Sequence, residues 1–148
     1  MKEEEDIILE TEGSEYMVLG NLLIEGILAY KAYDIFHNHH LIAVNSENHK
    51  VIRIQVKSRW AIDYDGSFPM SNFDCDFVIH VALNRGYRFK EKHNKDKNIS
   101  KPPTIYIFPI NVLHSIGEID TLRRIDLNAI KDVDMYINNW DLIKKQIN

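Results

Sequence analysis

The sequence predicts a single α/β domain in which a small sheet is flanked by helices. The length of 148 residues suits one domain with one hydrophobic core, and no repeat or interdomain linker divides the chain. Apolar residues at 45% and charged residues at 27% are the balance of an ordinary globular protein. The spacing of the apolar residues predicts the element order helix, strands, loop, strands, helix.

Helices are predicted at both ends of the chain. Residues 11–26 form the first, with Ser14 as its cap and Gly26 where it ends, and its apolar stripe consists of Met17, Val18, Leu19, Leu22 and Leu23. Residues 126–147 form the last, with an apolar face of Ile130, Val133, Ile137, Trp140 and Ile143. One domain is therefore expected over residues 1–148, with a core at about 11–115 and a C-terminal helical segment at about 126–147.

Five strands are predicted between the helices, at residues 27–36, 41–44, 51–58, 77–83 and 105–110. The third strand alternates most regularly. One of its faces carries Ile52, Ile54 and Val56, and the other carries Arg53, Gln55 and Lys57. The apolar face can therefore pack on the core while the polar face lines a cleft.

Charge is unevenly distributed along a chain whose net charge is −4. Residues 1–15 carry seven acidic residues against one lysine, whereas residues 85–101 carry seven basic residues against two acidic ones. The basic segment is either a phosphate-binding patch or a solvated loop, and composition does not decide between them.

Cys75 is the only cysteine, which excludes an internal disulfide and a cysteine-based zinc site within one chain. Beside Phe77 and Val78, it is expected to be a buried small side chain. No apolar run approaches the ~18 residues that span a bilayer. The acidic start lacks the features of a signal peptide, so a cytoplasmic protein without membrane contact is expected.

Gln55 and Lys57 lie two residues apart on one face of the third strand. An amide oxygen and an amine at this spacing can hold a hard cation and steer an attacking water, as metal-dependent phosphodiester hydrolysis requires. Glu15 can complete the shell of the cation if the first helix packs beside the sheet. The alternative is that both side chains lie on the solvated face of a strand.

The order of these residues resembles the PD-(D/E)XK nuclease superfamily. Gly13-Ser14-Glu15 opens a helix, a hairpin follows, and the core strand reads Ile54-Gln55-Val56-Lys57-Ser58. This strand is similar to the Ile-Gln-Val-Lys-Ser/Thr strand of a small endonuclease-like branch, and the likeness covers residues 11–115. The resemblance implies a restriction-endonuclease-like domain with a small mixed central sheet.

The resemblance also implies a role for each matched residue. Lys57 would orient or deprotonate the attacking water and stabilise charge on the phosphate. Gln55 stands where most relatives have Glu or Asp, and Glu15 matches an acidic residue that many relatives carry on the first helix. Mg²⁺ or Mn²⁺ is the expected cofactor.

The sequence departs from this family at the first acidic position. Relatives carry an Asp directly before the apolar run that is here residues 41–44, but His40 precedes this run and Asp34 is the nearest Asp upstream. In one reading, Asp34 enters the site through a shifted register or a bulge and the enzyme is active. In the other, His40 occupies the Asp position and the site is weakened, because histidine is a poor ligand for Mg²⁺.

The function implied by the resemblance is a metal-dependent DNA endonuclease that acts in restriction, repair or defence. The candidate catalytic residues are Lys57, Gln55, Glu15 and Asp34, and the candidate metal ligands are Asp34, Gln55 and Glu15, with His40 as the alternative to Asp34. The candidate DNA contacts are Arg53, Arg59, Arg85, Arg88, Lys90 and Lys92. The alternatives are a degenerate domain that binds nucleic acid or joins an assembly, and a protein-interaction domain that uses only the fold. A homodimer is also expected, because many nucleases of this type dimerise to cut both strands.

Overall fold

The structure of the protein is a computed structural model. It describes residues 2–32, 39–61, 66–70, 74–86, 100–117 and 124–148. None of the helices in these segments is long and apolar enough to cross a membrane.

A five-stranded sheet forms the centre of the molecule, in the order β1-β2-β3-β5-β6. Its strands are β1 (Ala29–Lys31), β2 (Leu41–Asn45), β3 (Lys50–Arg59), β5 (Phe77–Ala82) and β6 (Thr104–Pro109). β3 and β5 run parallel, while the other neighbouring pairs are antiparallel. The small mixed sheet expected from the sequence is therefore confirmed.

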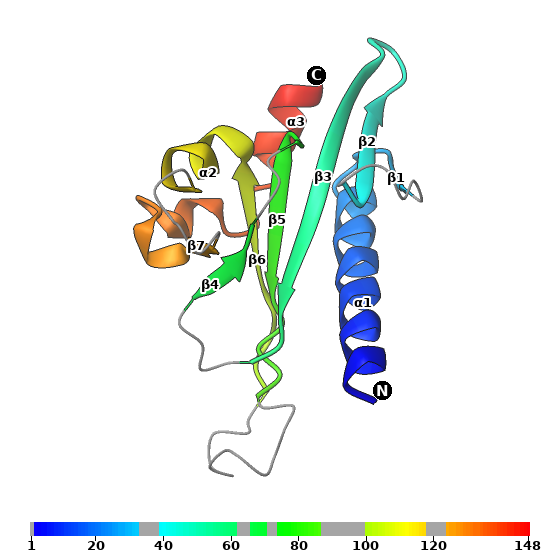
Figure 1. Ribbon diagram of the computed structural model, residues 1–148. Coiled ribbons are helices and arrows are strands. Elements are labelled where there is room, and N and C mark those ends of the chain that lie inside the picture. The colour runs from blue at the N-terminus through cyan, green and yellow to red at the C-terminus, as the bar shows by residue number, and fades with distance from the viewer. Residues whose placement is uncertain (1, 33–38, 62–65, 71–73, 87–99, 118–123) are drawn as a thin grey trace.

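The two faces of the sheet are covered by different elements (Figure 1). The long helix α1 (Lys2–Ile24) and the short helix α3 (Asp141–Ile147) pack on one face, where Ile52, Ile54 and Val56 of β3 are buried. The other face carries α2 (Ile110–Gly117) and a two-stranded sheet of β4 (Ser67–Pro69) and β7 (Arg124–Asp126). The central sheet therefore separates two hydrophobic cores, and the alternating side chains of β5 and β6 contribute to both of them.

Helix α1 begins nine residues before the predicted start at residue 11. Its first turn carries Glu3, Glu4 and Glu5, whose negative charges stabilise the N-terminal end of a helix. Ser14 lies inside the helix and is buried, so its prediction as a cap is wrong. Gly26 ends the helix as predicted: its φ is 78°, and the N–H of Ile27 donates to the carbonyl of Leu22 at 2.8 Å.

The prediction of one continuous helix over residues 126–147 is wrong, since only Asp141–Ile147 is α-helical. Two short 3-10 turns, Leu127–Ala129 and Val133–Tyr136, precede it. Asp132 and Asn138 adopt left-handed backbone conformations, with φ of 52° and 49°. The N–H of Asn138 donates to the carbonyl of Ile105 at 2.8 Å, so hydrogen bonding to the edge of β6 replaces helical hydrogen bonding.

The segment predicted as a strand over residues 27–36 contributes only the three residues of β1. Its part from residue 33 onward lies outside the described residues. Strands β2, β3, β5 and β6 agree with the predicted strands to within one or two residues at each end. Helix α2 and the β4–β7 pair were not predicted.

Candidate active site

The candidate site lies along β3, at the place where its neighbour β2 begins. Leu41, the first residue of β2, pairs with Ile54 of β3. Just before it, the N–H of His40 donates to the carbonyl of Ile54 at 2.8 Å, and the N–H of Val56 donates to Nδ1 of His40 at 2.9 Å. His40 therefore bridges the residues on either side of Gln55 in β3.

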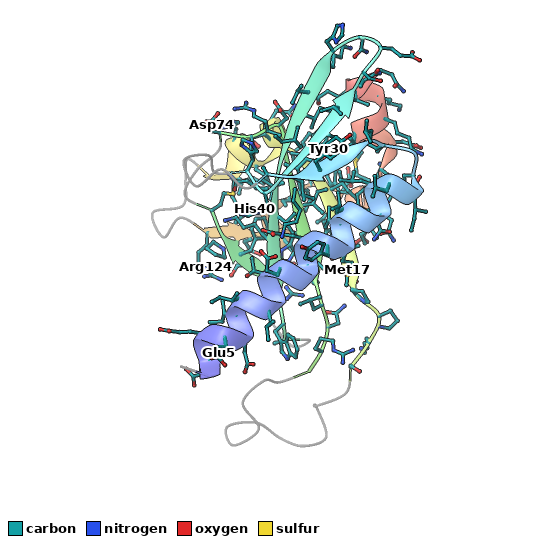
Figure 2. The ribbon with its side chains drawn as sticks, turned by 90° about the vertical axis from the view of Figure 1, so that its right-hand side faces the viewer. Glu5, Met17, Tyr30, His40, Asp74 and Arg124 are labelled. Atoms are coloured by element: carbon teal, nitrogen blue, oxygen red, sulfur yellow. The ribbon has the colours of Figure 1, made fainter. Side chains whose placement is uncertain are left out.

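Glu15 reaches the same place from α1. Its side chain is 7% exposed, and its Oε1 lies 3.6 Å from Nδ1 of His40. Its other carboxylate oxygen lies 3.1 Å from Nζ of Lys31, on β1. Figure 2 looks onto α1 and shows His40 beside this helix, close to β2. The predicted packing of the first helix beside the sheet is confirmed, and it brings Glu15 to His40.

The hydrogen bond from Val56 determines the chemistry of His40. A ring nitrogen that accepts an N–H carries no proton, so in the neutral ring the proton is on Nε2. Burial lowers the pKa of His40, while Glu15 raises it and Lys57 lowers it. At neutral pH the ring is therefore uncharged and offers an N–H donor at Nε2.

Gln55 and Lys57 flank Val56 in β3. Because Val56 belongs to the core under α1, both side chains lie on the other face of the strand. Gln55 is 2% exposed. Lys57 is half-buried, and burial lowers its pKa, with Cys75 acting weakly in the opposite direction. Among the described residues, no ion pair is formed by Lys57.

Glu15 thus approaches His40 from the α1 side of the sheet, whereas Gln55 and Lys57 lie on the opposite face of β3, and Glu15 and Lys57 shift the pKa of His40 in opposite directions. The site combines a buried carboxylate, a neutral imidazole N–H and an amine whose charged form is disfavoured by burial. An amine and an N–H donor can bind the oxygens of a phosphate, and a carboxylate can accept a proton or hold a cation. Within the described segments, no three carboxylates, imidazoles or thiols are grouped closely enough to hold a metal ion.

The predicted DNA contacts fall into three groups. Arg53 already pairs with acidic side chains, because its guanidinium lies 2.8 Å from Asp74 and 3.5 Å from Asp76. Arg59 is half-buried and lowers the pKa of His80, while Arg85 is exposed. The remaining candidates lie outside the described residues, together with Asp34, and are Arg88, Lys90 and Lys92.

Two residues near the site were not predicted. Lys31 pairs with Glu15, and its side chain is 6% exposed. His80 on β5 pairs in register with Lys57 and is fully buried, with its ring stacked on Phe68 at a centroid distance of 4.6 Å. Lys31 carries a sequence signal, since a lysine within an apolar segment needs a nearby carboxylate when that segment is buried.

Cys75 is buried, as predicted, and burial raises the pKa of its thiol to about 11. The thiol is therefore protonated at neutral pH, which disfavours a role as nucleophile.

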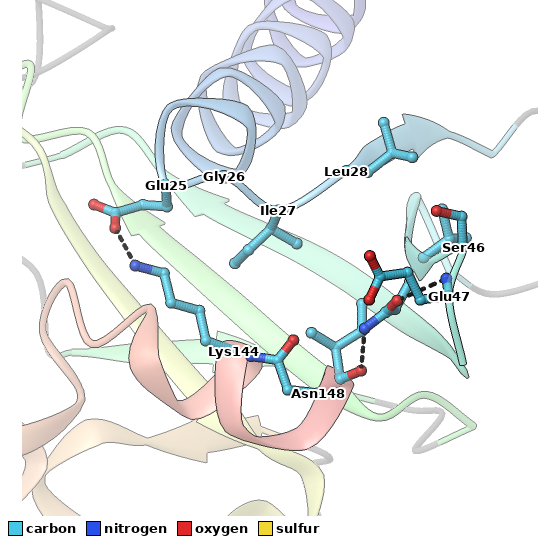
Figure 3. A pocket seen from close by; sticks show the side chains of 11 residues that line it. Glu25, Gly26, Ile27, Leu28, Ser46, Glu47, Lys144 and Asn148 are labelled. Atoms are coloured by element: carbon cyan, nitrogen blue, oxygen red, sulfur yellow. Dashed lines mark hydrogen bonds and ion pairs between the residues drawn. The ribbon is translucent and has the colours of Figure 1, made fainter. Parts of the chain in front are cut away.

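A depression of about 380 Å³ lies at the C-terminal end of α1 (Figure 3). It is lined by the turn after α1, the turn between β2 and β3, and α3, and an ion pair between Glu25 and Lys144 at 2.8 Å lies at its side. Ten residues of helix, about 15 Å, separate Glu25 from Glu15. The depression is therefore separate from the candidate site.

The fold is similar to that of a solved structure, the bacterial homing endonuclease I-Ssp6803I. The two chains are 18% identical, with a TM-score of 0.60, and the match covers 93% of this chain and 92% of that one. No protein-family model and no curated protein matches the sequence. The similarity confirms the nuclease-like α/β fold.

Proposed function

We propose that the protein is a DNA endonuclease that hydrolyses phosphodiester bonds with the help of a divalent metal ion. The arrangement that supports this function best is the meeting of Glu15 and His40 beside the stretch of β3 that carries Gln55 and Lys57. A carboxylate and an amine with disfavoured charge are the groups that position and activate a water next to a phosphate. The fold shared with a homing endonuclease is consistent with the same function.

The donor types fit Mg²⁺ or Mn²⁺, because the buried carboxylate of Glu15 and the buried amide of Gln55 both offer oxygen. Glu15, Gln55 and Asp34 would hold the ion, which supplies an acidified water and neutralises charge on the phosphate. Lys57 would orient the water and stabilise the charge that develops on the phosphate oxygens. The Nε2–H of His40 would donate to one of these oxygens.

Asp34 is the better candidate for the first acidic ligand. Nδ1 of His40 is occupied by the N–H of Val56, so a metal ion would have to bind Nε2, which carries the proton of the neutral ring. Loss of that proton would create an imidazolate, which is unfavourable at neutral pH. His40 therefore acts better as a donor to the substrate than as a ligand to the ion.

The endonuclease is tested by incubating the purified protein with supercoiled plasmid and Mg²⁺ or Mn²⁺. Nicking or linearisation is expected, and Lys57→Ala should slow it about 100-fold or more while DNA binding stays within about threefold. Lys50→Ala is the matched control, since Lys50 lies at the other end of β3 and binds the carbonyl oxygen of Asn148. Cleavage that persists unchanged in Lys57→Ala contradicts the proposed site.

A second candidate function is a DNA-binding subunit without catalysis. It is favoured by the charge balance of the site, in which Gln55 replaces an acidic residue and Glu15 is already paired with Lys31. Salt-dependent DNA binding without cleavage at any metal concentration would support it.

A homodimer would place one site on each DNA strand, and light scattering with and without DNA tests whether the protein forms this dimer.

A further inference from the structure

Lys31 is a buried cation to which the proposed chemistry gives no role. Its Nζ lies 2.6 Å from Oε2 of Glu12 and 3.1 Å from Oε2 of Glu15, and it stands 4.3 Å above the ring of Tyr16. These three partners belong to adjacent turns of α1. Two carboxylates and the face of an aromatic ring surround the ammonium, and this environment favours its charged form.

The two carboxylates that hold Lys31 differ in their surroundings. The Glu12 side chain is 49% exposed, whereas that of Glu15 is 7% exposed and also lies 3.6 Å from His40. A carboxylate as buried as Glu15 requires a compensating positive charge. Lys31 supplies this charge at 3.1 Å, and a divalent ion bound to Glu15 would supply charge to the same carboxylate.

A divalent ion on Glu15 and an ammonium 3.1 Å from the same carboxylate would repel each other, since the side chains of Lys31 and Glu15 are both little exposed to the screening solvent. The geometry offers Lys31 a second position, because Glu12 and the face of Tyr16 can keep the ammonium when it leaves Glu15. Binding of the divalent ion would thus break the ion pair between Lys31 and Glu15, while the ion pair between Lys31 and Glu12 would remain.

We propose that Lys31 is the resident counter-cation of Glu15 and competes with the divalent ion for this carboxylate, so that Lys31 sets the metal concentration at which the site fills. This inference rests on the proposed metal-dependent function. Lys31 acts through Glu15 and does not touch the substrate.

The test is the affinity of the full chain for Mn²⁺, measured by calorimetry and by the rise in melting temperature with added Mn²⁺. Lys31→Met removes the competing charge and should lower the Kd for Mn²⁺ about tenfold or more. Lys31→Gln keeps N–H donors for Glu12 and Glu15 without the charge, so it tests the same effect if Lys31→Met does not fold. Lys31→Arg keeps the charge and should bind Mn²⁺ within about threefold of the unaltered protein.

Lys144→Met is the matched control, because Lys144 forms an ion pair of 2.8 Å with Glu25 at the far end of α1. Its Kd should be unchanged. Equal or weaker Mn²⁺ binding by Lys31→Met and Lys31→Gln overturns the inference, since Lys31 would then hold Glu15 in place for the ion. If neither the unaltered protein nor the Lys31 variants bind Mn²⁺, the metal-dependent function itself is overturned. Binding that appears only in the Lys31 variants supports the inference.

Discussion

His40 and Glu15 approach each other to 3.6 Å between Nδ1 and Oε1, although 25 residues separate them in the chain and they belong to different layers of the fold. Glu15 comes from the middle of α1, and His40 lies just before β2, where one backbone hydrogen bond to Ile54 and one from the N–H of Val56 to its ring hold it to β3. This contact marks the place where a residue of α1 meets the residues that adjoin β3.

Glu15→Gln and Glu12→Gln form a matched pair, because both residues bind Lys31 but only Glu15 reaches His40. At saturating Mn²⁺, Glu15→Gln should slow plasmid cleavage about 100-fold or more, since it removes the buried carboxylate that would hold the ion. Glu12→Gln should change the rate less than about threefold, because exposed ion pairs contribute little. Equal loss in both variants would mean that Lys31, rather than Glu15, is the group that cleavage requires.

Asp34→Asn and His40→Asn distinguish the two candidates for the first acidic position. We expect Asp34→Asn to abolish cleavage and Mn²⁺ binding, and His40→Asn to leave Mn²⁺ binding within about threefold while slowing cleavage about tenfold through the loss of one donor. Calorimetry and plasmid nicking measure the two effects separately. The opposite pattern, in which only His40→Asn loses the ion, would assign the ligand to His40.

The buried ring of His80 should make stability depend on pH. Burial, with Arg59 acting in the same direction, lowers the pKa of His80 to about 3 from an ordinary value of 6.5. Protons therefore bind the unfolded chain more tightly, and stability is lost as the pH falls below about 6.5. We expect a loss of about 2 kcal/mol between pH 7.5 and pH 5 from this residue, measured by urea unfolding.

His80→Phe serves as the test of this assignment, because a phenyl ring can still stack on Phe68 but cannot be protonated. The variant should lose most of the pH dependence between pH 7.5 and pH 5. His49→Asn, a change at an exposed turn residue with φ of 61°, should keep it. A steep pH dependence that survives in His80→Phe would show that another group carries it.

Two glycines of the α1 region should respond to alanine in opposite ways. Gly20 lies inside α1 with no atom within 4 Å of an added Cβ, so Gly20→Ala should stabilise the protein by about 0.5–1 kcal/mol. Gly26 has the same free space but a φ of 78°, so Gly26→Ala should destabilise it by about 1 kcal/mol. Thermal unfolding measures both. A gain of stability in Gly26→Ala would show that the end of α1 is not held in the left-handed conformation.

Local pattern was sufficient to predict β3 and the face on which each of its side chains lies. The alternation of Ile54, Val56 and their polar neighbours assigns each side chain to a face, and the apolar side chains are buried in the core under α1, although Gln55 on the other face is buried as well. The spacing of Gln55 and Lys57 places both side chains on one face of a strand, and this can be predicted without knowing the tertiary structure. The position of Glu15 could be predicted only through a resemblance, because a helix can pack on a sheet at many rotations.

The wrong prediction for the C-terminal tail and the failure to predict the role of Lys31 have a common physical cause. In both places, hydrogen bonds or ion pairs with residues distant in the sequence outweigh the local pattern. The tail has the apolar spacing of a helix, but Asn138 bonds to Ile105 and Asp132 turns the chain in a left-handed conformation. Lys31 appeared as one polar residue in an apolar segment, and its partners on α1 are at least 15 positions away in the sequence. A stretch of sequence short enough to show helical or strand periodicity does not contain both residues of such a pair.

The pairing of β4 with β7 limits how far the protein can be shortened. Phe68 of β4 pairs with Ile125 of β7, and both are almost completely buried over the face of the sheet that carries Phe108. A chain that stopped after α2 would keep every strand of the central sheet. It would, however, leave β4 without its partner strand and expose the rings of Phe68 and Phe108 to water. Such a fragment should aggregate rather than fold, because exposed apolar surface beside an unpaired strand promotes association. The segment that follows the nuclease-like core therefore acts as its cover.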